Sequence, residues 1–180
     1  MKDAGSKEWK IPEKHLTDSM YVRAYEIRID LFRAVVVVGA SGTPYHDALF
    51  FFDIAFPFDY STHPPEVHYH SFRLRHNPNL YASGYVCLSL LNTWLGKGKE
   101  KWDPSQSTIL QVLVLIHGLV LNKEPYFNEV GAGNRFGCEA SQAYNEKIFI
   151  LTCKTTLYLL RRPPLNFKAF TAAFLFGEWS

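Results

Sequence analysis

Cys87 is the residue of this sequence best suited to covalent chemistry. It follows a valine and precedes a leucine, and its thiol, once deprotonated, is a nucleophile. A cysteine in an apolar run is more often a small core residue, so this position alone decides nothing. Asn79 stands eight residues upstream, directly after Pro78, in a turn that would hold its side chain near the thiol. An amide N–H at such a place can donate to an oxyanion, so the pair points to acyl transfer from a thioester.

Short motifs on both sides of Cys87 resemble the active-site region of ubiquitin-conjugating enzymes. They come in the family's order and spacing, as Asn77-Pro78-Asn79, Gly84, Val86-Cys87-Leu88-Ser89-Leu90-Leu91 and Trp102-Asp103-Pro104. The similarity covers about residues 5 to 165, most of the chain. Leu91-Asn92-Thr93-Trp94, followed by an insertion of glycines and lysines, is similar to the large-type branch, which includes plant phosphate-homeostasis conjugating enzymes and conjugating/ligase hybrids.

This resemblance implies an enzyme that works through a thioester on Cys87, with no cofactor and no metal. Cys87 would accept the carboxyl terminus of ubiquitin from a ubiquitin-activating enzyme. It would then pass the acyl group to a lysine of a protein substrate with the help of a ubiquitin ligase. Asn79 would stabilise the oxyanion or support the loop that covers it. The thiol is expected to be exposed on an otherwise rigid segment.

The resemblance leaves open how the incoming lysine is activated. Many family members carry an aspartate two residues after the cysteine, but this chain has Ser89 there, which cannot accept a proton at neutral pH. Activation would then come from desolvation of the amine or from a group on the facing loop, where Asn128 and Glu129 are the candidates. His76, next to the Asn77-Pro78-Asn79 turn, is an alternative base that no local pattern supports.

The chain departs from the family pattern at several positions, which raises an alternative function. These positions are Pro12, Ala48, Phe58, Ser61 and Asn77. The departures would suit a non-catalytic, ubiquitin-binding variant of the same fold. The presence of Cys87 and Asn79 at the family spacing favours the enzyme, because a copy that has lost its activity usually shows the loss at the cysteine.

The composition and hydrophobic pattern predict one α+β domain over residues 1–180. The resemblance implies that it is either a fragment or a short member of a family of longer chains. Alternating or continuous apolar runs predict four strands, at residues 20–31, 34–38, 49–55 and 66–70. Because the connections are short, these strands are expected to form an antiparallel β-meander. The flanking helices are expected in the N-terminal residues, with a break at Pro12, and at Ile109–Leu121, Ala140–Leu160 and Asn166–Phe176. Pro163-Pro164 is expected to end the helix at Ala140–Leu160.

Composition argues against several classes of function. The net charge of +2 is too small to predict a nucleic-acid partner. The apolar stretch Ile109–Leu121 is broken by polar residues and a glycine, so no membrane span is expected. Three cysteines without metal-type pairing, and a start without a signal-peptide core, predict an intracellular protein of the cytoplasm or nucleus.

Two rival chemistries remain open from the residues alone. A cysteine hydrolase would need a histidine and an orienting carboxamide that converge on Cys87, and the chain has seven histidines but no local protease signature. A metal site could draw on four of these, which are His63, His68, His70 and His76. Because Cys-x-x-Cys and His-Glu-x-x-His spacings are absent from the sequence, histidines on a strand surface are the simpler interpretation.

Overall fold

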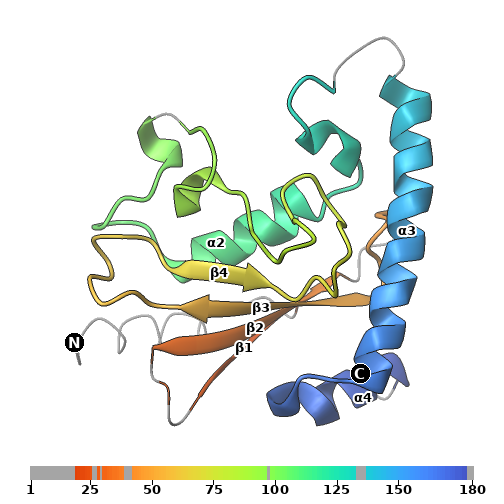
Figure 1. The fold of residues 1–180 in the computed structure, drawn as a ribbon, viewed down its shortest axis with the longest axis horizontal. Coiled ribbons are helices and arrows are strands. Elements are labelled where there is room, and N and C mark those ends of the chain that lie inside the picture. The colour runs from red at the N-terminus through yellow and green to blue at the C-terminus, as the bar shows by residue number, and fades with distance from the viewer. Residues whose placement is uncertain are drawn as a thin grey trace.

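The computed structural model describes residues 19–25, 28, 30–38, 42–96, 98–132 and 137–177. This part of the chain contains a four-stranded antiparallel sheet in the order β1-β2-β3-β4, with helices packed on both of its faces (Figure 1). The strands are β1 (Met20–Ala24), β2 (Leu31–Val38), β3 (Ala48–Ala55) and β4 (Glu66–Tyr69). The predicted α+β fold with an antiparallel meander is confirmed.

Apolar residues on both sides of the central strands build two hydrophobic clusters. On β3, Phe50, Phe52 and Ile54 face the larger cluster, whereas Leu49 and Phe51 face the smaller one. Successive side chains of a strand point to opposite faces of the sheet, so a run of consecutive apolar residues can be buried only when both faces are covered. The dense phenylalanines of this strand therefore reflect a sheet that lies between two layers.

Helix α2 (Ile109–Leu115) covers the larger cluster. The Thr108 side chain accepts a hydrogen bond from the backbone N–H of Gln111, and the Gln111 side chain accepts one from the backbone N–H of Thr108. This reciprocal capping box starts the helix. The chain continues as a π-helical turn over Ile116–Val120, so the predicted helical span is present with a wider last turn.

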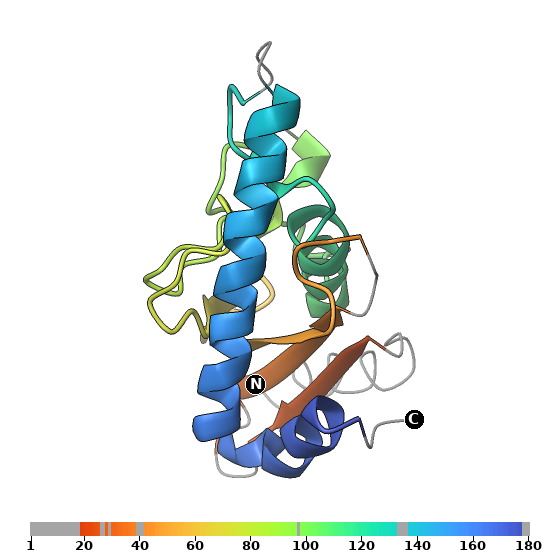
Figure 2. The same ribbon diagram turned by 90° about the vertical axis from the view of Figure 1, so that its right-hand side faces the viewer.

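Helix α3 (Gly137–Arg161) runs along one side of the molecule and ends before Pro163-Pro164, as predicted (Figure 2). After a 3₁₀ turn at Leu165–Phe167, helix α4 (Lys168–Leu175) crosses the smaller cluster and covers the second face of the sheet. Within the described ranges, no helix has the length and apolar character needed to cross a membrane.

The predicted boundary between the first two strands is wrong. The first strand ends at Ala24, and Leu31 begins β2. The Leu31 N–H donates to the Arg28 carbonyl (2.9 Å) and the Tyr25 N–H donates to the Leu31 carbonyl (3.3 Å), which reverses the chain in a turn. The alternating pattern of residues continues through the turn, so periodicity did not locate it. The predicted N-terminal helix and its break at Pro12 lie outside the described residues.

Candidate active site

Cys87 lies in the long segment that joins β4 to α2 (Figure 1). Isolated β-bridges pair His68 with Tyr85 and Leu80 with Val86, so the segment folds back on itself and against the sheet. The bridge to Leu80 holds the backbone of Val86, which is the residue just before the cysteine. The thiol therefore sits on a pinned backbone rather than on a free loop.

Asn79 and Cys87 are joined by two hydrogen bonds. The Cys87 N–H donates to the Asn79 carbonyl (2.9 Å), and the Asn79 side-chain amide donates to the Cys87 carbonyl (2.8 Å). The structure thus brings these two predicted site residues together, with the asparagine in a supporting position. Stabilisation of an oxyanion by the same amide stays a prediction.

The Cys87 thiol is covered in this structure, with only 4% of the residue exposed. The expectation of an exposed thiol is therefore wrong for this conformation. Its Sγ donates a hydrogen bond to the Thr93 carbonyl (3.1 Å). Burial raises the pKa of the Cys87 thiol, and the nearby Glu129 carboxylate raises it further, because both disfavour the thiolate.

Asn77 is the buried centre of a network that supports this segment. Its side-chain amide donates to Tyr45 Oη (2.9 Å) and to the Val120 carbonyl (2.7 Å). Its side-chain oxygen accepts from the Asn79 N–H (2.9 Å) and from the Asn128 amide (3.2 Å). All the hydrogen-bonding capacity of this amide is used, so Asn77, one of the departures from the family pattern, supports the loop.

His76 is a core residue rather than a base for the thiol. Its ring is buried, with Nδ1 3.1 Å from Tyr69 Oη and Nε2 2.9 Å from Thr155 Oγ1. Burial lowers the pKa of His76, because the charged imidazolium is poorly solvated there. Both ring nitrogens are already taken by hydroxyl groups, so the structure corrects the alternative of a catalytic His76.

The three candidates for positioning a lysine occupy different surroundings. Asn128 donates to the Val120 carbonyl (3.1 Å) and belongs to the network around Asn77. Glu129 is exposed, lies 3.6 Å from Arg75 Nη2, and is close enough to act on the pKa of the Cys87 thiol. Ser89 begins a 3₁₀ helix of three residues and lies against the Gly96 backbone. Of the three, Glu129 is the titratable group, and its charge acts on the pKa of the thiol. All three roles stay predictions.

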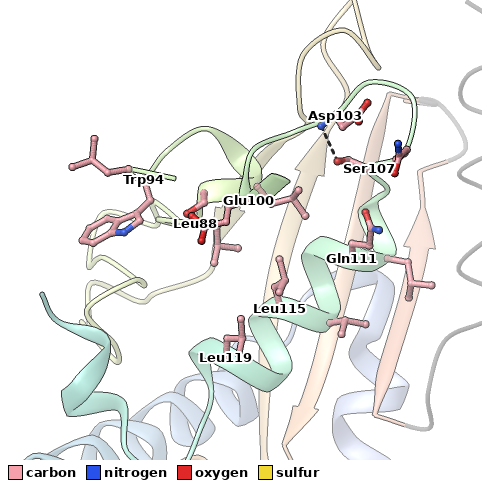
Figure 3. A pocket seen from close by; sticks show the side chains of 14 residues that line it. Leu88, Trp94, Glu100, Asp103, Ser107, Gln111, Leu115 and Leu119 are labelled. Carbon is pink, nitrogen blue, oxygen red and sulfur yellow. Dashed lines mark hydrogen bonds between the residues drawn. The ribbon is translucent and has the colours of Figure 1, made fainter. Parts of the chain in front are cut away.

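A groove of about 940 Å³ lies next to the cysteine segment, between it and the outer face of α2 (Figure 3). Leu88 and Trp94 line one side, and Leu115 and Leu119 line the other. Glu100 and further polar residues stand along the same groove, as Figure 3 shows. Its lining includes Leu88, the residue after Cys87, and combines apolar side chains with a few polar groups, which is the usual character of a binding site.

Thr93 is a site residue that the sequence reasoning missed. Its carbonyl accepts from the thiol, and its hydroxyl donates to the Val86 carbonyl (2.8 Å) and accepts from the Leu88 N–H (2.9 Å). The residue stands in the Leu91-Asn92-Thr93-Trp94 motif, which the resemblance had singled out only as a mark of the family branch. A hydroxyl residue so close to the cysteine in sequence was the available signal.

The departures from the family pattern that the structure describes are accommodated without loss of the fold. The Ser61 hydroxyl donates to the Pro104 carbonyl (3.0 Å), and the Trp102 indole N–H donates to the Ser61 carbonyl (2.7 Å). Ala48 is buried in the first position of β3, and Phe58 projects from the surface. Ser61 therefore joins the connection between β3 and β4 to the Trp102-Asp103-Pro104 motif.

Two of the histidines weighed as metal ligands are paired with carboxylates. His70 Nε2 lies 2.9 Å from Asp53, which also binds Arg33 through two hydrogen bonds (2.5 and 2.8 Å). His63 lies 2.5 Å from Asp59. In the part of the chain that the structure describes, no group of three or more histidine, cysteine, aspartate or glutamate residues could hold a metal ion.

A cysteine thiol can act as the nucleophile of acyl transfer, and here it lies on a segment that is hydrogen-bonded to Asn79 and borders a mainly apolar groove. Residues 6–151 match the family described as "Ubiquitin-conjugating enzyme". The chain belongs to this family, and the resemblance stated from its motifs is confirmed.

Relatives of this chain include plant and animal conjugating enzymes. The chain is 58% identical over 174 residues to "Probable ubiquitin-conjugating enzyme E2 25" of Arabidopsis thaliana, with 94% of this chain and 28% of the relative covered. It is 57% identical over 166 residues to "Probable ubiquitin-conjugating enzyme E2 23" of the same plant, with 90% and 15% covered. It is 42% identical over 160 residues to the human "Dual E2 ubiquitin-conjugating enzyme/E3 ubiquitin-protein ligase BIRC6", with 84% and 3% covered. The chain thus spans less than a third of the length of each.

Proposed function

We propose that this chain is a ubiquitin-conjugating catalytic domain that carries ubiquitin as a thioester on Cys87. The observation that carries the proposal is the Cys87–Asn79 pair, with two hydrogen bonds that fix the thiol segment beside an apolar groove. Family membership supports the same conclusion, since it accounts for a cysteine with a neighbouring asparagine in this fold.

In the first step, the Cys87 thiolate attacks the thioester carbonyl that joins the ubiquitin carboxyl terminus to the activating enzyme. The new carbon–sulfur bond forms as the old one breaks, and the activating enzyme's thiol leaves with its electron pair. A tetrahedral oxyanion lies between the two states, and a second N–H of the Asn79 amide is the donor proposed to stabilise it. The proton of Cys87 must be lost beforehand, because the thiolate is the nucleophile.

In the second step, a substrate lysine amine attacks the Cys87 thioester, and Cys87 leaves as a thiolate while an isopeptide bond forms. The amine must lose its proton to attack. Glu129 is the proposed acceptor or positioning group, because it is an exposed carboxylate near the thiol. Ser89 and Asn128 are proposed to shape the approach of the lysine.

The proposed partners are ubiquitin, a ubiquitin-activating enzyme, a ubiquitin ligase and protein substrates. The groove is lined mainly by apolar side chains, with Trp94 and Leu119 on opposite sides (Figure 3). This lining supports the binding there of the ubiquitin molecule that is joined to Cys87. We also propose an intracellular location, in the cytoplasm or nucleus. The three free cysteines, Cys87, Cys138 and Cys153, support a reducing compartment.

The test is a charging assay with activating enzyme, ATP and ubiquitin, read on a non-reducing gel. We expect a band heavier by one ubiquitin that disappears with thiol reductant. Cys87→Ser should give a band that resists reductant, because an oxygen ester replaces the thioester. The matched control is the double variant Cys138→Ser/Cys153→Ser, which keeps Cys87 as the only thiol and should charge like the parent.

If folded protein gives no charged band, the proposed conjugating activity is refuted. Titration of uncharged protein with ubiquitin then tests the non-catalytic variant, which requires binding without charging. A charged band that survives in Cys87→Ser and still disappears with reductant would place the thioester on another cysteine.

A further inference from the structure

The residues around Thr93 form a clamp on the segment that carries the thiol. Thr93 Oγ1 donates to the Val86 carbonyl (2.8 Å), with the Leu88 carbonyl as a second acceptor at 3.1 Å. The same oxygen accepts a hydrogen bond from the Leu88 N–H (2.9 Å), and the Thr93 N–H donates to the Leu88 carbonyl (3.2 Å). One side chain thus binds the residues on both sides of Cys87.

The hydrogen bonds of this clamp hold the Thr93 carbonyl within hydrogen-bonding distance of the Cys87 thiol. The oxygen accepts from Cys87 Sγ at 3.1 Å and from Tyr85 Oη at 3.4 Å. A hydrogen bond donated by S–H favours the protonated form, and a thiolate in the same place would face the negative end of a carbonyl dipole. The nucleophilic form of Cys87 therefore requires Sγ and this carbonyl to separate.

We propose that Thr93 is a positioning residue that holds Cys87 in a covered, protonated state until an acyl donor arrives. The inference rests on the proposed role of Cys87 as the ubiquitin acceptor. Trp94 and Leu95 follow Thr93 directly and line the groove. A polypeptide that enters the groove contacts the same stretch of chain that carries the covering carbonyl, so entry and uncovering of the thiol are coupled.

The test measures the reactivity of the thiol without ubiquitin. In the Cys138→Ser/Cys153→Ser background, Cys87 is the only thiol, and its alkylation by iodoacetamide is followed from pH 6 to pH 10. Among the residues that the structure describes, Glu129 acts on the thiol pKa, Arg75 pairs with Glu129, and Tyr85 shares the Thr93 carbonyl with the thiol; all three stay unchanged. Any difference between variants then comes from Thr93.

Thr93→Val keeps the branched shape and removes the hydroxyl. We expect its alkylation at pH 7 to be faster by roughly two- to tenfold, the factor that corresponds to one ordinary hydrogen bond, and the midpoint of the pH profile to move to lower pH. Thr93→Ser keeps the hydroxyl and should follow the parent profile. Thr156→Val is the matched control, since its hydroxyl donates to the Thr152 carbonyl on α3 and lies outside the clamp.

An unchanged pH profile in folded Thr93→Val would overturn the proposal. So would a lower melting temperature without a shift of the midpoint, because that result means a structural role alone. If the valine variant does not fold, the proposal is tested by Raman spectroscopy of the S–H stretching band of Cys87. This band is measured in the Cys138→Ser/Cys153→Ser protein, which has no other thiol. A band at the frequency of a free thiol contradicts the contact, whereas a shift to lower frequency supports it. None of these readouts needs ubiquitin, so a failed charging assay and a failed clamp are separate results.

Discussion

At the scale of single residues, the amides near the thiol have well-defined supporting positions. Asn77 uses all of its hydrogen-bonding capacity on Tyr45, Asn79, Val120 and Asn128. Within the part of the chain that the structure describes, the Asn79 side-chain nitrogen makes one hydrogen bond, to the Cys87 carbonyl, and an amide nitrogen carries two hydrogens. Asn79 is therefore the amide with a donor left for chemistry, whereas Asn77 serves the backbone.

Asn79→Ala tests how much Asn79 contributes to the rate of ubiquitin transfer and how much to stability. We expect transfer of ubiquitin to free lysine to slow by about a hundred- to a thousandfold, the usual cost of one oxyanion donor, and stability to fall by about 1 kcal/mol. Single-turnover transfer from charged protein and urea unfolding measure the two effects.

The matched control is Asn145→Ala. Asn145 also donates its side-chain amide to a backbone carbonyl, that of Lys123 (2.8 Å), and it starts from α3. Its loss should leave the transfer rate as it is. Transfer at the parent rate by Asn79→Ala would contradict the oxyanion role and leave loop support alone.

At the scale of elements, the turn before the cysteine depends on a glycine. Gly84 has a φ of +91°, in the region that side-chain-bearing residues rarely adopt. A Cβ there would also lie 2.1 Å from His68 Cε1 on β4. The Tyr69 N–H donates to the Gly84 carbonyl (2.7 Å), so β4 and the turn hold each other.

Gly84→Ala should therefore destabilise the protein by about 1–3 kcal/mol, measured by urea unfolding. The double variant His68→Ala/Gly84→Ala removes the steric part and keeps the φ strain. We expect the glycine substitution to cost less in the His68→Ala background than in the parent. Equal costs in both backgrounds would show that the histidine ring gives way freely.

At the scale of the whole molecule, one carboxylate connects β2, β3 and the end of β4. Asp53 on β3 binds Arg33 on β2 and His70 just after β4. Burial alone would raise the pKa of Asp53, but the hydrogen bonds from His70 and Arg33 outweigh it and hold the pKa well below its usual value.

Because the folded pKa is lowered, this group stabilises the fold above its unfolded pKa of 3.8, and that contribution disappears as the pH falls further. Asp53→Asn should cost about 2 kcal/mol at pH 6, and less at pH 2.5, by urea unfolding at the two pH values. Asp59→Asn is the control, because Asp59 pairs with His63 on the exposed surface, and its substitution should have a small effect on stability. A cost that stays the same at both pH values, or that grows at the lower one, would contradict a lowered pKa for Asp53.

Much of the architecture follows from local signals in the sequence. Consecutive phenylalanines on β3 predicted a buried strand, and Pro163-Pro164 marked the end of α3. The turn after Pro78 was also expected to hold Asn79 near Cys87, and two hydrogen bonds join these residues. Such signals work because backbone sterics and side-chain periodicity act over a few residues.

The state of the thiol depends on contacts between distant parts of the chain. No local pattern shows that the Thr93 carbonyl covers Cys87, that Thr155 binds His76 across 79 residues of chain, or that Val120 receives the Asn77 amide. These contacts depend on how the long segment after β4 packs against α2 and α3, and burial then sets the pKa of the groups enclosed. Residue types and their spacing identified which side chains carry the chemistry, whereas the packing of distant segments determines which of them are free to perform it.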